Sequence, residues 1–111
     1  MKKVVVLSLG GSLIVPQEID WKFLKSFKEI LLHNSRHFKF VVVCGGGSIA
    51  RVYIRGLEHL QLKNKQYFQN NLGISTTRLN ARFMTYFFGK DANKGIPHDI
   101  IDVEIKAVFF P

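Results

Sequence analysis

The sequence is poor in cysteine, in acidic residues and in long apolar runs. Its single cysteine, Cys44, excludes an internal disulfide. Its 8 acidic residues are too few to indicate a Ser/His/Asp triad or a pair of catalytic carboxylates. No apolar run approaches the roughly 20 residues that a membrane helix needs. These shortages direct attention to chemistry that works without acids, disulfides or a bilayer.

The sequence also argues against a metal site and against a signal peptide. His33 and His37 have helical spacing, but Ser35 interrupts them and neither a cysteine nor a carboxylate joins them, so we expect no metal site. The apolar run after Lys3 breaks at two glycines, too early for a signal peptide. We therefore expect that run to be the first strand of a cytoplasmic protein that does not contact membranes.

Apolar and basic residues are abundant in the sequence. A hydrophobic fraction of 47% and 10 Phe in 111 residues indicate one packed domain. The net charge of +8 is spread along the chain, without a block of like charge. Such a charge fits a nucleic-acid binder, but no recognition motif accompanies it, and a positive field also suits anionic nucleotides. Nucleic acid is therefore an alternative partner and not the one we expect.

The apolar pattern predicts alternating strands and helices. Residues 3–9 and 39–44 form Val-rich runs, which we expect to be strands of a parallel sheet, the first of them buried on both faces. A helix begins after a predicted N-cap at Asp20 and ends near residues 33–35, and a second helix follows the glycines at 45–47 and carries apolar positions up to Leu60. This order predicts a right-handed parallel α/β unit within one domain.

The second half of the chain is less regular. We predict a third helix from Ser75 to about Phe88, which Gly89 ends. Its expected buried stripe consists of Leu79, Phe83, Tyr86 and Phe87. Before it, residues 61–72 are expected to be a loop or a short helix; after it, residues 91–99 are expected to be a loop and residues 100–110 a strand.

Two glycine clusters end the two predicted strands. Gly10 and Gly11 precede Ser12, which suits either a phosphate loop or an ordinary tight turn. The second cluster, residues 45–47, is three glycines in a row, more than a turn requires, and it opens a helix with Arg51 one turn in. We interpret the second cluster as a phosphate cradle; the alternative is a flexible turn beside a surface arginine. It matches neither a P-loop nor a dinucleotide-binding fingerprint.

A third group of polar residues lies near the start of the third predicted helix. Thr77 and Asn80 are three residues apart and share a helix face, which suits a sugar or a base. Taken alone, this polar segment is better explained by simple N-capping by Ser75 or Thr76.

Together these motifs resemble the amino acid kinase family, most specifically its archaeal-type UMP kinases. The resemblance rests on LGGSLIVP at residues 9–16, ID at 19–20, VVVCGGGSIARVY at 41–53 and LGISTTRLNA at 72–81. It implies a three-layer αβα sandwich with a mainly parallel sheet. It also implies phosphoryl transfer from ATP to UMP with Mg²⁺ in pyrimidine nucleotide biosynthesis, and a homo-oligomer, a hexamer in the family.

The resemblance also assigns residues to the two nucleotides. For the ATP phosphates it implies Gly10, Gly11, Ser12, Gly47 and Arg51. For UMP it implies Gly45, Gly46, Asn70, Thr77 and Asn80. No catalytic residue is assigned, because positioning and charge neutralisation can drive phosphoryl transfer without a covalent nucleophile.

The chain departs from the family pattern in three places. Ser8 stands where many members have a lysine, and Asn70 stands where an acidic residue usually binds the nucleoside. The chain stops at Pro111, before the family's second Gly-rich loop and ATP base-binding lobe. We therefore expect residues 1–111 to be the N-terminal, UMP-side part of an incomplete domain, a truncated chain.

Three alternatives remain open. One is another kinase of the same fold, acting on a carboxylate or an isoprenoid phosphate. The second is a non-catalytic nucleotide-binding or oligomerising module, and the third is a basic nucleic-acid binder.

Overall fold

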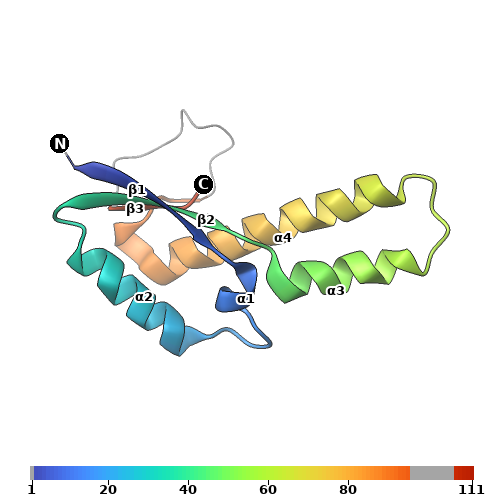
Figure 1. Cartoon of the computed structure of the whole chain (residues 1–111), viewed down its shortest axis with the longest axis horizontal. Helices are drawn as coiled ribbons and strands as arrows, with labels where there is room; N and C mark the ends of the chain where they lie inside the picture. Colours follow the sequence, from blue (N-terminus) through green and yellow to red (C-terminus); the bar gives the residue numbers. More distant parts are fainter. Residues whose placement is uncertain (1, 96–106) are drawn as a thin grey trace.

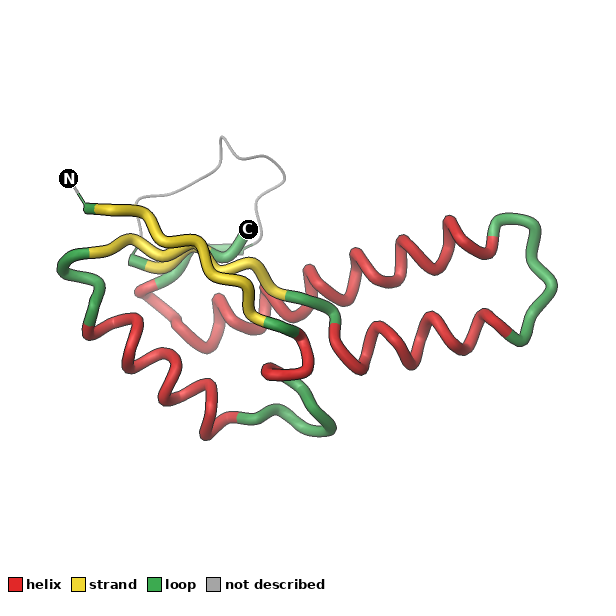
Figure 2. Tube along the Cα trace, in the orientation of Figure 1, coloured by secondary structure: helices red, strands yellow, loops and turns green. Residues whose placement is uncertain are grey.

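A computed structural model describes residues 2–95 and 107–111 of the chain. Figure 1 shows a small sheet with helices beneath it and a long helical hairpin that extends away from the sheet. The elements are β1 (Lys3–Leu9), α1 (Gly11–Ile14), α2 (Trp21–His33), β2 (Phe38–Cys44), α3 (Gly47–Glu58), α4 (Lys65–Phe88), the 3-10 turn η1 (Gly89–Asp91) and β3 (Val108–Phe109). The same elements can be followed along the backbone trace in Figure 2.

The described strands form one parallel sheet in the order β1-β2-β3. β1 pairs with β2 from Lys3 opposite Phe38 to Leu9 opposite Cys44. β3 pairs with the middle of β2 and is short, with Val108 opposite Phe40. The parallel α/β fold predicted from the sequence is confirmed. The predicted final strand is seen at Val108 and Phe109, and its residues 100–106 lie outside the described residues.

The core lies on one face of the sheet, against α2 and α4. Side chains of β1 and β2 meet those of the two helices there, and the cluster includes Leu9, Phe40, Val42, Cys44, Leu24, Leu31, Ala81, Met84 and Phe88. The opposite face is different: Val4 and Val6 are 60% and 66% exposed. The expectation that β1 is buried on both faces is therefore wrong for the described residues, because their helices cover one face of the sheet only and alternate strand residues point away from it.

Helix α2 follows its prediction closely. The side chain of Asp20 accepts a hydrogen bond from the backbone N–H of Phe23 at 3.2 Å, so the predicted N-cap is confirmed. Leu24 and Leu31 face the core. The Nζ of Lys28 donates to the carbonyl of Phe87 at 3.1 Å, where a cation also meets the negative end of α4.

Helix α4 begins ten residues earlier than predicted, at Lys65. Polar residues can occupy its first turns because most of them face solvent. The Thr76 and Thr77 hydroxyls donate to the carbonyls of Leu72 and Gly73, four residues back, so neither residue caps a helix start. The interpretation of this segment as an N-cap is therefore wrong, and residues 65–88 form one helix of 24 residues.

The predicted buried stripe of α4 is correct only in part, because Phe83 and Phe87 are partly buried and pack against the core. Leu79 and Tyr86 are 58% and 72% exposed. The buried side of α4 carries smaller and more polar residues instead, namely Gln69, Thr76, Asn80, Ala81, Met84, Thr85 and Phe88. Close approach to the sheet and to the glycine loops selects this face, and hydrophobicity alone does not reveal it.

Helices α3 and α4 pack against each other as a hairpin (Figure 1). Their outer surface carries large apolar side chains, among them Val52, Tyr53 and Tyr67, each at least 59% exposed. Among the described helices, none has the length and hydropathy to cross a bilayer.

Candidate functional site

The two glycine loops lie side by side because their strands are paired. Leu9 and Cys44, the last residues of β1 and β2, are register partners. The backbone N–H of Gly45 then donates to the carbonyl of Leu9 at 2.9 Å. Parallel strands thus deliver both loops to the same edge of the sheet, where ligands of open α/β sheets usually bind.

Glycine is required where the loops touch. A Cβ on Gly11 would lie 2.3 Å from the Gly47 nitrogen and 2.5 Å from the Gly46 carbonyl carbon, both backbone atoms. Gly47 has φ +64°, and a Cβ there would lie 2.4 Å from the Gly11 carbonyl carbon. We call the contact between Gly11 and Gly45, Gly46 and Gly47 the glycine junction. No side chain fits within it.

Gly10 and Ser12 differ from the junction glycines. Gly10 has φ −59°, and a Cβ there would have no atom within 4 Å, so another residue would fit. The predicted first loop is short, because Gly11–Ile14 already form one helical turn. Ser12 lies in that turn, and its Oγ accepts a hydrogen bond from Arg51 Nη2 at 3.2 Å.

Two further side chains brace the junction. Asn80 of α4, 3% exposed, donates from Nδ2 to the carbonyl of Gly45 at 2.8 Å and to that of Gly46 at 3.4 Å. The hydroxyl of Ser48 donates to the carbonyls of Val15 and Pro16, at 3.0 and 3.1 Å. Helix α3 is thereby tied to the segment after α1, and α4 to the second loop.

A groove of about 640 Å³ opens beside the junction, between α3 and α4. Its lining residues are Gly46, Gly47, Ala50, Arg51, Ile54, Gln69, Asn70, Gly73, Ile74 and Thr77. Five of the ten residues predicted for nucleotide binding are among them: Gly46, Gly47, Arg51, Asn70 and Thr77. Gly10, Gly11, Ser12 and Gly45 lie at or near the junction but outside this lining, and Asn80 lies behind it.

Sequence reasoning missed part of this groove. Gln69 and Gly73 face it from turns of α4 that were expected to be a loop or a short helix, and Ile54 faces it from α3. A continuous helical spacing from Gln69 through Gly73 to Thr77 was the available signal. Gln69 is nearly buried and donates to the carbonyl of Ile54 at 3.0 Å, which joins the two helices along the groove.

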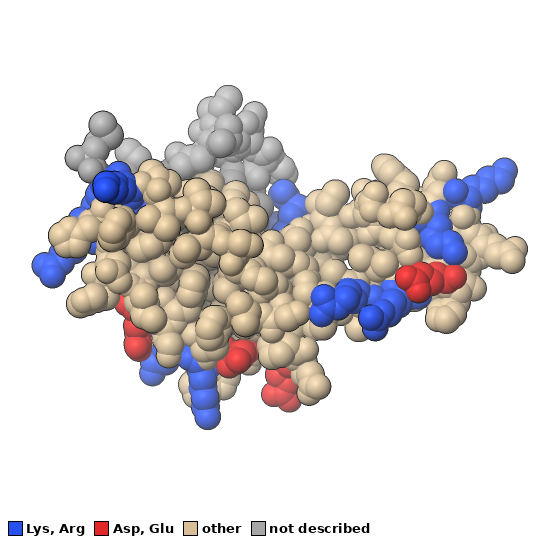
Figure 3. Space-filling view, viewed as in Figure 1, with Lys and Arg blue, Asp and Glu red and all other residues tan. Residues whose placement is uncertain are grey.

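The groove is electropositive in composition. Arg51 is a cation and none of the lining residues is a carboxylate. Figure 3 shows Lys and Arg side chains along α3 and at both ends of the molecule, with few acidic ones between them. Within the described part of the chain, the N–H groups of Gly46 and Gly47 donate to no protein acceptor. Free amides and a guanidinium at the start of α3 suit a phosphate.

The thiol of Cys44, next to the glycine junction, is unreactive at neutral pH. Cys44 is buried, and burial raises its pKa to about 12 because the thiolate would lose its hydration. It therefore stays protonated at neutral pH and packs as a small apolar side chain.

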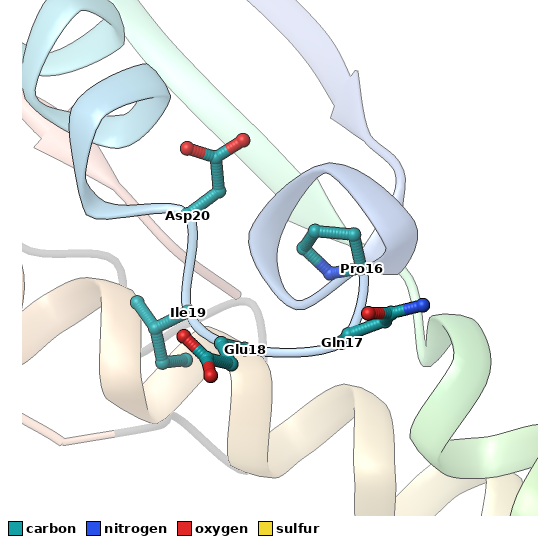
Figure 4. Close-up of a pocket in the computed structure, with 5 residues that line it drawn as sticks. All are labelled: Pro16, Gln17, Glu18, Ile19 and Asp20. Atoms are coloured by element: carbon teal, nitrogen blue, oxygen red, sulfur yellow. The ribbon is translucent and has the colours of Figure 1, made fainter.

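No metal cage is formed by the residues that the structure describes. They hold no group of three His, Cys, Asp or Glu side chains in a common position. A separate hollow of about 460 Å³ is lined by residues 16–20. Figure 4 shows that its two carboxylates, Glu18 and Asp20, point to different sides of the loop. The described residues thus do not fit a protein-held Mg²⁺, which favours several oxygen ligands around one point.

Comparison with known proteins agrees with this geometry. The chain is 33% identical over 95 residues to a uridylate kinase of Thermococcus kodakarensis, a match that covers 86% of this chain and 41% of that protein. It is 37% identical over 100 residues to a uridylate kinase of Thermoplasma volcanium, covering 90% of this chain and 42% of that protein. The chain therefore spans about two fifths of the length of these relatives.

A solved structure shows the same arrangement. The uridylate kinase of Archaeoglobus fulgidus superposes with a TM-score of 0.77 at 30% identity, over 97% of this chain and 49% of that one. The family model of the amino acid kinase family matches residues 3–108. The resemblance based on the glycine motifs is confirmed, and the chain belongs to the amino acid kinase family.

Proposed function

We propose that this chain supplies the phosphate-binding part of a uridylate kinase-like phosphotransferase. The reaction is transfer of the γ-phosphoryl group of ATP to UMP, giving ADP and UDP for pyrimidine nucleotide synthesis in the cytoplasm. The names of the relatives support the choice of UMP as acceptor. The homo-oligomer that the resemblance implies stays a prediction.

The glycine junction with Arg51 is the observation that carries this proposal. Gly46 and Gly47 offer N–H groups without side chains, and Arg51 offers a guanidinium, all on the lining of one groove. Gly10, Gly11 and Ser12 border the same point from the first loop. Phosphoryl transfer depends on holding the two phosphates in line and neutralising their charge, which these groups can do without a nucleophile.

The neighbouring part of the groove is assigned to the rest of UMP. Asn70 and Thr77 line it from α4. The Asn70 Oδ1 accepts a hydrogen bond from Gln66 at 2.9 Å, which holds its side chain on the exposed surface of the helix. Amide and hydroxyl groups of this kind hydrogen-bond a ribose or a pyrimidine edge.

Magnesium enters the proposal only as a companion of ATP. When bound to the nucleotide it would neutralise the phosphate charge. The described residues form no acidic cluster to hold it, so its ligands there would be the phosphates themselves, and we derive no step through it.

Titration calorimetry of the 111-residue chain with UMP and with ATP tests the binding claim. We expect UMP to bind, and Arg51→Ala to weaken binding, whereas Arg55→Ala, one turn along α3 and outside the groove lining, should not. An assay of ADP release with both nucleotides tests turnover. Turnover with a carboxylate or an isoprenoid phosphate in place of UMP would contradict the choice of acceptor.

A non-catalytic nucleotide-binding module is the second candidate. It is favoured by Ser8, which stands where the family pattern has a lysine and which is exposed on the uncovered face of β1. Binding of UMP without ADP release would support this candidate. Salt-sensitive RNA binding that survives Arg51→Ala would instead favour the nucleic-acid alternative.

A further inference from the structure

We propose that Asn80 is a positioning residue, which orients the second glycine loop and does not itself contact the nucleotide. The inference rests on the proposed function, and it replaces the sequence-based assignment of Asn80 to UMP. Asn80 lies on α4 and reaches the loop across 35 residues of sequence, with its Nδ2 at 2.8 Å from the Gly45 carbonyl.

Burial separates Asn80 from the groove. Its side chain is 3% exposed, and its neighbour Ala81 is 2% exposed on the same side of α4. Thr77, one turn earlier, lines the groove, but Asn80 does not. A nucleotide in the groove would therefore meet Thr77 and the loop backbone, with Asn80 behind that backbone.

Peptide geometry explains how a side chain behind the loop can act on its front. In a trans peptide the carbonyl of one residue and the N–H of the next point in opposite directions. No cis peptide occurs among the described residues. When Asn80 draws the Gly45 and Gly46 carbonyls toward α4, the N–H groups of Gly46 and Gly47 are turned the other way, away from the buried face of α4.

Glycine makes such a brace necessary. Three consecutive glycines have little conformational preference of their own, so the loop would otherwise sample many backbone states. Two hydrogen bonds from one planar amide restrict both free peptide units at once. The brace prepares the donors before any ligand arrives, which lowers the entropy lost on binding.

The test compares Asn80→Ser with Met84→Ala in the full chain. Both sites lie on the buried side of α4, but Met84 contacts the core, so its variant controls for lost stability. We expect Asn80→Ser to weaken UMP, CMP and inorganic pyrophosphate alike, by roughly tenfold, because a positioning role affects every phosphate equally. Met84→Ala should leave these affinities within about twofold at comparable stability.

A loss confined to UMP, with pyrophosphate binding unchanged, would mean that Asn80 contacts the nucleoside and would overturn the proposal. So would equal losses in Met84→Ala. If Asn80→Ser does not fold, Asn80→Asp serves instead, because it keeps the side-chain shape and replaces the donor by an acceptor.

A second readout does not need a ligand. Amide exchange at Gly45, whose N–H bonds to Leu9, and at Ala50, whose N–H faces the Gly46 carbonyl, reports the order of the loop. We expect protection there to fall about tenfold in Asn80→Ser, with Leu24 of α2 unchanged. Unchanged protection would refute the brace. If the wild-type chain binds no phosphate compound while exchange responds as expected, the proposed function fails and the positioning role stands.

Discussion

The glycine junction and the α3–α4 hairpin both contain glycine, but the glycines have different roles in the two places. At the junction, Gly11 and Gly47 stand where any Cβ would collide with backbone. In the hairpin, Gly56 has no atom within 4 Å of a Cβ position, and Gly73 has only the Ile54 side chain, at 3.9 Å. Glycine count alone therefore carries little information. The informative glycines are those that another backbone segment approaches.

Gly11→Ala should show the largest effect and breaks the junction directly. Its Cβ would lie 2.3 Å from the Gly47 nitrogen, and backbone cannot move aside as a flexible side chain does. We expect a loss of about 3 kcal/mol in the free energy of unfolding. Urea denaturation measures it. Gly10→Ala is the matched control and should change stability by less than about 0.5 kcal/mol; equal losses in both variants would show that the junction is not the tight contact described.

Arg51→Ala should separate binding from stability. The side chain of Arg51 is exposed, and its hydrogen bond to Ser12 lies at the surface. Its removal should therefore change the free energy of unfolding little. Phosphate binding should weaken roughly tenfold or more, because a charged donor is lost. Calorimetry with UMP and with ATP measures the affinity of Arg51→Ala, with Arg55→Ala as the control variant. Identical affinities in the two variants would remove Arg51 from the proposed site.

The third prediction concerns how the stability of the chain depends on pH through Cys44, which precedes the junction glycines. Because its folded pKa, about 12, lies above the reference value of 9.0, the unfolded chain loses its proton first as pH rises. The stability that this thiol contributes is complete below about pH 9 and declines between pH 9 and pH 12. Denaturation at about pH 8 and about pH 10 should therefore show a smaller alkaline loss in Cys44→Ala than in the wild type. A thiol that reacts as fast in the native chain as in urea would contradict its burial.

Gly56→Ala should have the smallest effect on stability, and it should raise stability where Gly11→Ala lowers it. Gly56 lies inside α3 with open space around it, so alanine should stabilise the helix by about 0.5–1 kcal/mol. Thermal unfolding measures the gain. Gly73→Ala should stabilise α4 similarly but also narrow the groove, and thereby weaken UMP binding. A destabilised Gly56→Ala would show that this part of the hairpin is more closely packed than the junction comparison assumes.

The sequence predicted the local features that depend on short spacing. Asp20 caps α2 as expected. The two strands coincide with the apolar runs, and a glycine loop follows each of them. Each of these follows from neighbours within a few residues, where rotamer, hydrogen-bond and turn preferences act. The family resemblance followed from the same short motifs.

The errors arose where distant segments decide the outcome. Residues 65–74 are polar and irregular in sequence, yet they complete α4 because α3 packs along them. The apolar residues Leu79 and Tyr86 were expected inside but are exposed, because the side of α4 that meets the sheet and the second loop requires small residues and the amide of Asn80. Val4 and Val6 were expected to be buried, but the described helices cover one face of the sheet.

By itself the sequence determined the strand–glycine–helix units and the family to which they belong, since these depend on local backbone preferences and short motifs. Tertiary structure decided which residues form the candidate site. Pairing β1 with β2 brings Gly11 against Gly47, 36 residues apart, and leaves no room for any side chain. Packing of α4 against the second loop also buries Asn80 and places its Nδ2 2.8 Å from the Gly45 carbonyl. The physical reason is that contact between backbones, unlike periodicity, depends on residues that the chain brings together only on folding.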